Sequence, residues 1–211
     1  MNSQDEALLR AILPDVSRET FDRLQAFEQM FRKWSSKINL AAPSALEDLW
    51  SRHILDSAQL VNLQKPEGIW LDLGSGGGFP GLIIAILMRD QPGAYIHLVE
   101  SVGKKAVFLK VALMEVGGRG EVHNMRINEA VAGIVDVKIV TARALAPLRD
   151  LLALASPWLS RGALGLFHKG REFKEELALA RDDWTFDLIE HVSKVDAESV
   201  ILEISNVSHR I

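Results

Sequence analysis

A short glycine-rich segment carries the clearest chemical signal in the chain. Residues 70–81 read WLDLGSGGGFPG, with five glycines in the last eight positions, and they lead into the apolar run GLIIAILM. A strand that ends in glycines and turns into a helix exposes backbone N–H groups beside the positive end of that helix. Glycine also lets a ligand touch the main chain. The segment therefore predicts a loop that holds a nucleotide-like cofactor.

Two motifs overlap in this loop. Counted from Asp72, it reads acidic-x-Gly74-x-Gly76-x-Gly78, the pattern of S-adenosylmethionine sites; counted from Gly76, it reads G-x-G-x-x-G, the dinucleotide pattern. Glu100 follows Asp72 by 28 residues and ends the apolar segment YIHLVE, where a carboxylate can accept hydrogen bonds from both ribose hydroxyls. Such a residue would serve NAD or an adenosyl cofactor equally, so the loop alone leaves both possibilities open.

The elements that position the loop alternate between strand and helix from residue 69 onwards. This alternation predicts an α/β fold with a parallel sheet. The last two strands are separated by few residues and should form an antiparallel hairpin. The seven predicted strands are IWLDL, YIHLVE, EVHN, VKIVTA, GALGLFHK, TFDLIEHV and ESVILEI, and the helices start at Pro80 and cover about 104–116, 148–155 and 172–181.

The beginning of the chain has a different pattern. SQDE at 3–6 is a capping box, Ser17 precedes a run with apolar residues at helical spacing, and SALE at 44–47 should open a third helix. Nothing in this part predicts strands. We therefore expect a helical extension over residues 1–65 and a cofactor-binding domain over residues 66–211.

Composition narrows the class of protein. A chain of 211 residues suits one domain with an extension, and 48% hydrophobic with 25% charged residues is typical of soluble globular proteins. The absence of cysteine excludes disulfides, thiolate metal sites and a cysteine nucleophile, and no metal site is predicted. The opening MNSQDEALLR is no signal peptide and no apolar run is long enough to span a bilayer, so we predict a cytoplasmic monomer without a membrane partner. The net charge of -4 leaves room for one positive face.

Several further motifs resemble one enzyme family. The loop, Glu100 and the terminal hairpin look like a Rossmann-like class I S-adenosylmethionine-dependent methyltransferase. DLGSGGGFPGL is similar to the loop of the bacterial 16S ribosomal RNA guanine-N7 methyltransferases, the rRNA small subunit methyltransferase G family. The resemblance covers about residues 25–175 and continues in INLAAP (38–43), RHILDS (52–57), ESVGKKAVFL (100–109), NEAV (128–131), TARALAPL (141–148) and FHKG (167–170).

This resemblance implies S-adenosyl-L-methionine as cofactor and 16S rRNA or the 30S ribosomal subunit as partner. It implies that the methionine moiety lies over Gly74 and Gly76 and that Glu100 holds the ribose. Arg143 should face the cofactor near the transfer site. The full set of cofactor-binding residues that it implies is Asp72, Gly74, Gly76, Phe79 closing the loop, Glu100, Asn128 and Glu129 at the adenine end, and Arg143.

The sequence also limits the chemistry. Methylation at C5 of a pyrimidine through a covalent adduct needs a cysteine, and there is none. TARALAPL lacks the Asn/Asp-Pro-Pro-aromatic motif of exocyclic amine methyltransferases. Guanine N7 has a free lone pair and no proton to lose, so a general base is not required, and no catalytic residue is assigned. The candidate RNA contacts are His53, Lys104, Lys105 and Lys169, with Arg143, Lys169 and His53 also candidates to fix guanine O6 and nearby phosphates.

Two other functions remain open at this point. An NAD-dependent oxidoreductase could use Gly76-x-Gly78-x-x-Gly81, but that register leaves Asp72 unused and the chain has little room for a separate catalytic domain. A non-catalytic RNA-binding or ribosome-binding module could retain the pocket as a relic, although the intact loop and Glu100 count against it. Binding of S-adenosylhomocysteine rather than NAD would separate the first alternative from a methyltransferase.

Overall fold

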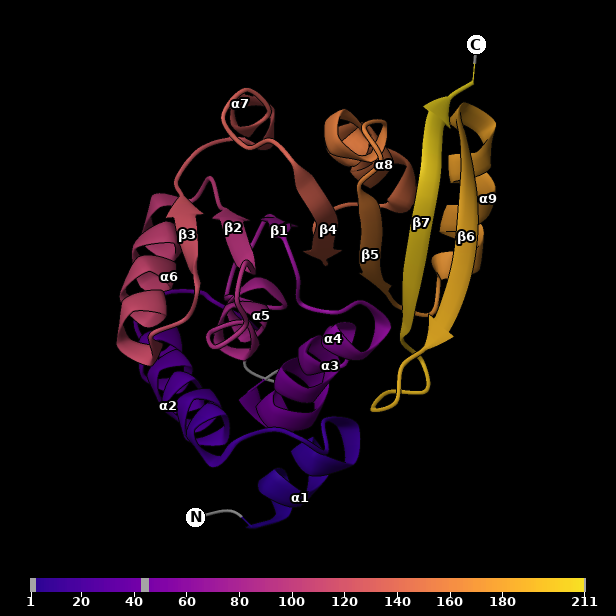
Figure 1. Ribbon diagram of the computed structural model, residues 1–211. Helices are drawn as coiled ribbons and strands as arrows, with labels where there is room; N and C mark the ends of the chain where they lie inside the picture. The colour runs from indigo at the N-terminus through magenta and orange to yellow at the C-terminus, as the bar shows by residue number, and fades with distance from the viewer. Residues whose placement is uncertain (1–2, 43–45, 211) are drawn as a thin grey trace.

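A computed structural model describes residues 3–42 and 46–210 of the chain. One seven-stranded sheet crosses the molecule in the order β3-β2-β1-β4-β5-β7-β6 (Figure 1). Strands β1 to β5 pair in parallel and β7 pairs antiparallel with both β5 and β6, which confirms the predicted fold class and terminal hairpin. The strands are β1 Ile69–Leu73, β2 Tyr95–Val99, β3 Gly120–His123, β4 Val137–Arg143, β5 Leu164–Lys169, β6 Trp184–Val192 and β7 Val200–His209.

Helices cover both faces of the sheet. One face packs against the N-terminal helices together with α5 and α6, and the other against α7, α8 and α9 (Figure 1). Side chains alternate between the two cores along a strand, so Trp70 of β1 enters the first core and Leu71 the second. The helices are α1 Ser3–Ile12, α2 Arg18–Ser35, a π-helical segment Trp50–Leu55, α3 Asp56–Ala58, α4 Leu60–Leu63, α5 Gly81–Leu87, α6 Gly103–Val116, α7 Ile127–Ala130, α8 Leu148–Leu159 and α9 Phe173–Asp183.

The N-terminal helices share a core with the sheet. Ser17 caps α2, because its Oγ accepts a hydrogen bond from the Thr20 backbone N–H at 3.1 Å. Phe31 of α2 packs edge-on against Phe79 of the glycine loop and Phe108 of α6, with ring centroids 5.2 and 6.0 Å apart. The predicted helix start at 44–47 lies mostly outside the described residues. One hydrophobic core thus joins the N-terminal helices to the sheet, although the sequence pattern changes near residue 65.

The carboxyl ends of β1, β2 and β4 lie at one edge of the sheet. The order of strands reverses between β1 and β4, since β2 lies on one side of β1 and β4 on the other. Ligands of open α/β sheets bind at such a switch point. The glycine loop at 74–80, Glu100 and Arg143 all follow directly from, or end, these strands. Within the described ranges, no helix combines the length and apolarity needed to cross a bilayer.

Candidate active site

A cavity of about 600 Å³ opens at this edge of the sheet, a volume in the usual range for small-molecule sites. We call it the loop cavity. Six of the eight predicted cofactor-binding residues line it, namely Gly74, Gly76, Phe79, Glu100, Asn128 and Arg143. Its walls come from residues 40–42, His53, the glycine loop, 99–101, Lys105, 125–128, 143–145 and Leu154.

The glycine loop forms the floor of the loop cavity through its backbone conformation. Gly74, Gly76 and Gly78 have φ angles of +66°, +51° and +94°, a region that residues with a side chain rarely adopt. A Cβ on Gly74 would also lie only 2.5 Å from Leu145 Cδ1, which borders the same cavity. Backbone geometry thus favours glycine at both Gly74 and Gly76, and at Gly74 the lack of space favours it as well.

Glu100 holds the loop against the end of β2. Its side chain is buried, Oε2 accepts a hydrogen bond from Gly76 N–H at 2.8 Å, and Oε1 accepts one from Val102 N–H at 2.7 Å. A carboxylate has about four acceptor positions, so two backbone bonds leave capacity for ribose hydroxyls. Asn124 also donates from Nδ2 to the Glu100 carbonyl oxygen at 2.9 Å. Glu100 therefore combines a loop-positioning role with a free acceptor face at the cavity.

Asp72 lies beneath the loop rather than among the residues that line the cavity. Its side chain is buried, and Thr141 Oγ1 donates to Oδ1 at 2.7 Å. Burial raises the pKa of Asp72 to about 6, although hydrogen bonds at Ser75 and Thr141 oppose the rise. A Cβ on Gly81 would collide with this carboxylate. The acid of the motif thus fills the space under the turn from β1 into α5.

The far wall of the cavity is formed by residues 125–128 after β3. Asn128 lines it, but Glu129 does not: the Glu129 Oε2 accepts a hydrogen bond from the Arg126 backbone N–H at 2.9 Å and caps α7. Sequence reasoning missed Met125 and Ile127, which border the same wall. Their signal was the apolar alternation just before the NEAV motif, on both sides of Arg126.

Arg143 and His53 close the opposite side. Arg143 donates from Nη2 to the Arg52 carbonyl oxygen at 2.7 Å, and its Nη1 lies 3.5 Å from Asp56 Oδ2. Burial lowers the pKa of Arg143, and Asp56 opposes this change. The His53 ring lies 5.1 Å from the Phe79 ring, and burial together with Arg143 lowers the pKa of His53 to about 4. The predicted RNA contact His53 is thus a neutral cavity residue on the π-helical segment, an irregularity frequent at functional sites.

A second cavity of about 430 Å³, which we call the polar cleft, shares Arg143, Ala144 and Leu145 with the first. Asp56 is buried there, and its backbone oxygen lies 3.0 Å from His168 Nε2, while His168 Nδ1 is buried without a protein partner. Burial lowers the pKa of His168, which keeps the ring neutral. Sequence reasoning did not select Asp56 or His168, because their partners are distant in the chain.

Lys169 occupies this polar cleft and does not present a free ammonium. Its side chain is only 8% exposed, and Nζ donates to the Ala146 carbonyl oxygen at 2.7 Å and to Glu176 Oε2 at 2.6 Å. Glu176 therefore lies against the polar cleft. Lys169 fixes the loop after β4, which is a different role from the predicted contact with RNA.

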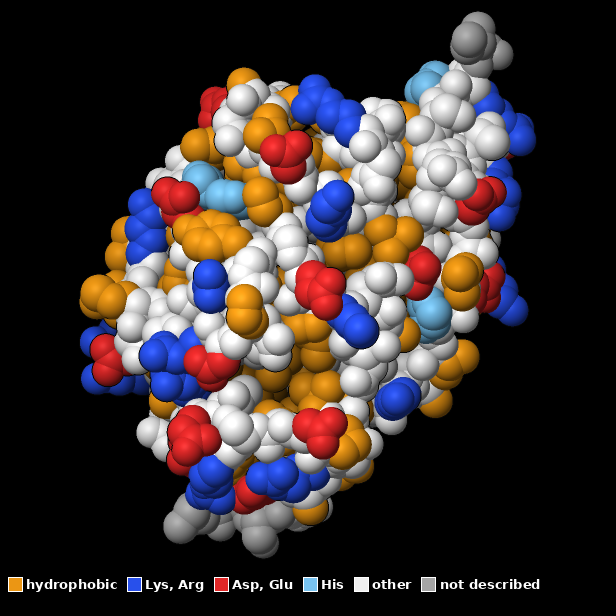
Figure 2. All heavy atoms as spheres, in the orientation of Figure 1, with side chains coloured by type: hydrophobic (Ala, Val, Ile, Leu, Met, Phe, Trp, Pro, Cys, Tyr) orange, Lys and Arg blue, Asp and Glu red, His pale blue; other side chains and the backbone are white. Residues whose placement is uncertain are grey.

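Lys104 and Lys105 begin α6 beside the loop cavity. Both line a shallow groove with Lys37, Ile38, Asn39 and Val102, and Lys105 also borders the loop cavity. On the face in Figure 2, Lys and Arg side chains are interspersed with Asp and Glu rather than forming one continuous basic patch. The positive charge of this groove thus comes from a small group of lysines, Lys37, Lys104 and Lys105.

Comparison with known proteins identifies the family. Residues 20–204 match GidB, the rRNA small subunit methyltransferase G family. The chain belongs to this family. Proteins named ribosomal RNA small subunit methyltransferase G from Brucella canis and Brucella suis are each 54% identical over 202 residues, which is 96% of this chain and 95% of theirs.

Solved structures support the fold of this GidB-family chain. A methyltransferase from Geobacter sulfurreducens superposes with a TM-score of 0.58 at 18% identity, covering 97% of this chain and 96% of the other. The O-methyltransferase TomG from Streptomyces achromogenes, in complex with S-adenosylmethionine, gives 0.57 at 16% identity and covers 87% and 89%. The protein is a methyltransferase with the class I fold and with S-adenosyl-L-methionine as cofactor.

Proposed function

We propose that this chain methylates N7 of a guanine in 16S ribosomal RNA of the small ribosomal subunit. Membership of the GidB family supports an rRNA substrate. The floor and walls of the loop cavity suit S-adenosylmethionine, because they combine glycine backbone and a buried carboxylate with the apolar side chains of Met125 and Ile127. That cofactor supplies an electrophilic methyl group on a positively charged sulfur.

The observation that carries the choice of N7 is the set of titratable side chains at the loop cavity. Glu100 already accepts two backbone hydrogen bonds, and His53 is a weak base because its pKa lies near 4. Arg143, Arg126 and Lys105 are cationic. Among the described residues that line the cavity, none is suited to remove a proton near neutral pH. Guanine N7 needs no proton removed, whereas an exocyclic amine or a ribose hydroxyl does.

The protein then contributes orientation and exclusion of water. Holding a nucleophile in line with the group it attacks is worth at most about 7 to 11 kcal/mol of the barrier. Phe79 and His53 close one side of the cavity, and Arg143 lies where both cavities meet. We propose that Arg143 donates to guanine O6 or to a neighbouring phosphate and that the target base lies over residues 144–147.

We further propose a division of labour among the basic residues. Lys104 and Lys105 contact RNA phosphates at the rim, while Lys169 supports the loop at 144–147 through Ala146 and Glu176. Structured RNA is bound mainly through shape, phosphates and looped-out bases. We propose that the protein acts as a cytoplasmic monomer.

The test is single-turnover transfer of labelled methyl to 30S subunits or 16S RNA, followed by nucleoside mass analysis. We expect 7-methylguanosine, and RNA that carries 7-deazaguanosine at the target should bind but accept no methyl group. Label on a pyrimidine carbon, a ribose hydroxyl or an exocyclic amine would refute the N7 assignment. Binding of cofactor and RNA without any transfer would favour a non-catalytic RNA-binding module.

A further inference from the structure

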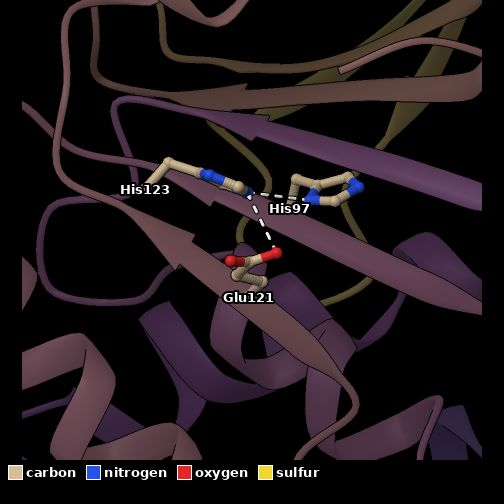
Figure 3. Close-up of side chains that lie close together, drawn as sticks. All are labelled: His97, Glu121 and His123. Carbon is tan, nitrogen blue, oxygen red and sulfur yellow. Dashed lines mark hydrogen bonds and ion pairs between the residues drawn. The ribbon is translucent and has the colours of Figure 1, made fainter. Parts of the chain in front are cut away.

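Two histidines and a glutamate meet on a part of the sheet that lies outside the loop cavity and the polar cleft. His97 belongs to β2, and Glu121 and His123 belong to the edge strand β3 (Figure 3). The β2–β3 register pairs His97 with Glu121, and side chains two residues apart share a face, so all three point to the same side. Helix α7, which has only four residues, lies on this side and leaves the edge uncovered.

The three side chains bring potential ligand atoms close together. His97 Nδ1 lies 2.8 Å from His123 Nε2, and His123 Nε2 lies 3.8 Å from Glu121 Oε2. The three atoms are all within 4.8 Å of one another. The Glu121 side chain is 59% exposed, so its carboxylate is free to move toward the two rings.

We propose that His97, Glu121 and His123 bind one divalent transition-metal ion, with Zn²⁺ the best match to the ligand set. Zn²⁺ binds imidazole nitrogen at about 2.0–2.1 Å and carboxylate oxygen at about 2.0–2.2 Å, with four ligands in all. Three protein ligands leave one position for water. Mg²⁺ and Ca²⁺ are excluded as preferred occupants because they favour oxygen ligands.

The hydrogen-bonded arrangement of the two histidines also suits such an ion. A metal needs the lone pair of a neutral imidazole. In the hydrogen-bonded pair, one of the two facing nitrogens carries the proton; with a metal, each ring keeps its proton on the other nitrogen.

The ion would join the edge strand to its neighbour. Strand β3 has only four residues and pairs on one side alone. Directly after His123, Asn124 donates from Nδ2 to the carbonyl oxygens of Glu100 at 2.9 Å and Ser101 at 3.2 Å. A metal at this point would therefore brace the two strands whose ends lead to the walls of the loop cavity, without contributing to methyl transfer itself.

The experiment is a Zn²⁺ titration of the full, tag-free protein without cofactor or RNA, followed by calorimetry and by metal analysis after dialysis. We expect one ion per chain in a Mg²⁺-containing buffer. His97→Ala and His123→Ala should each weaken binding at least about tenfold, since even partners outside the ligand shell change affinity by this amount. The matched control is His191→Ala, which removes a histidine that pairs with Glu203 Oε2 at 2.8 Å but lacks a second imidazole partner.

Glu121→Gln keeps the test valid if a histidine variant does not fold, because the Glu121 side chain is mostly exposed. Zn²⁺ should raise the Tm of the wild-type protein and of His191→Ala, and raise it less in Glu121→Gln. Absence of saturable binding, or equal affinity in the wild-type and His97→Ala proteins, would overturn the proposal and leave the pair as a simple hydrogen bond. Because the readout contains no substrate, failure here would leave the methyltransferase function untouched.

Discussion

The loop cavity and the polar cleft touch at Arg143 but are built in opposite ways. The loop cavity takes its form from backbone: three glycines at positive φ, with a carboxylate that accepts from loop N–H groups. The polar cleft takes its form from side chains that are far apart in sequence, centred on buried Asp56. A substitution that displaces the backbone of the glycine loop should therefore remove cofactor binding. A substitution of a side chain in the polar cleft should instead affect the stability of the fold and the position of Arg143.

The largest effect is expected from Gly74→Val. The variant places a branched side chain at φ +66° and against Leu145 Cδ1, so the loop must move and cofactor binding should be lost. Calorimetric titration with S-adenosylhomocysteine measures the loss. Gly133→Val is the control, because a Cβ at Gly133 meets nothing within 4 Å. Wild-type affinity in Gly74→Val would show that the cofactor does not rest on this loop.

Asp56→Ala should destabilise the fold while it leaves the glycine loop intact. Asp56 Oδ1 accepts from Gln59 Nε2 at 2.7 Å and from Ser193 Oγ at 2.9 Å, and Oδ2 faces Arg143 at 3.5 Å. Removal of one member of a buried ion pair costs about 3–5 kcal/mol, and the Arg143 side chain, which is 19% exposed, places the loss near the lower figure.

Urea unfolding and S-adenosylhomocysteine titration together test this separation. Asp90→Ala is a matched control: it removes an exposed acid 3.7 Å from Arg89 and should change stability by less than about 1 kcal/mol. If Asp56→Ala weakened cofactor binding as strongly as Gly74→Val, the two cavities would be one cooperative unit and the contrast between them would fail.

Sequence reasoning succeeded where the signal was local. The strand-loop-helix pattern is a property of short segments, and the alternation of apolar strand segments with helical segments predicted the seven strands that the sheet contains. For Lys169 and Glu129 the sequence reasoning did not consider nearby partners: Lys169 Nζ donates to Glu176 Oε2 on α9, and Glu129 Oε2 accepts from the Arg126 N–H at the start of α7. A charge in a sequence does not reveal its partner.

The polar cleft and the His97–Glu121–His123 cluster could not be predicted from the sequence, because their members lie far apart in it. Asp56 meets Ser193 across 137 residues, and His97 meets His123 across 26. Their contacts depend on sheet register and on which short helix leaves a face open. Neither property is encoded in a motif, so both sites follow only from the folded chain.

Asp72→Asn tests the support beneath the loop through its pH dependence. Because burial raises the pKa of Asp72 to about 6, this group stabilises the folded state fully below its unfolded pKa near 4, and the contribution is lost as pH rises through about 6. The unfolding free energy of the wild-type protein minus that of Asp72→Asn should fall by about 3 kcal/mol between roughly pH 4 and pH 7. The measurement is urea unfolding of both proteins across this pH range, with Asp90→Asn as the exposed control. A difference in unfolding free energy that did not change with pH would contradict the raised pKa of Asp72.

Glu100→Gln should have a smaller effect, confined to the loop cavity. Glutamine has one acceptor oxygen where glutamate offers two, so the N–H of Gly76 or of Val102 loses its partner. A buried donor without a partner costs the folded protein about 1–3 kcal/mol, and since cofactor binding needs the loop in its present position, up to the same amount, roughly five- to 150-fold, should be lost from the affinity for S-adenosylhomocysteine. Glu115→Gln on the exposed side of α6 is the control. An unchanged affinity would mean that Glu100 neither shapes the loop nor binds the ribose.

The smallest effect separates the rim of the loop cavity from the polar cleft. Lys104 is exposed at the start of α6, so Lys104→Ala should lower the salt dependence of RNA binding by about one unit of slope for one lost phosphate contact. Lys138→Ala is the control, because Lys138 lies at the amino end of β4, away from the loop cavity at the carboxyl ends of the strands, and this change should leave the slope unchanged.

Lys169→Ala should instead reduce stability, because it removes the bonds to Ala146 and Glu176. Filter binding of 16S RNA at several salt concentrations, with urea unfolding of each variant, decides between these roles. An equal loss of slope in Lys169→Ala would place that ammonium on RNA and make the polar cleft part of the RNA-binding surface.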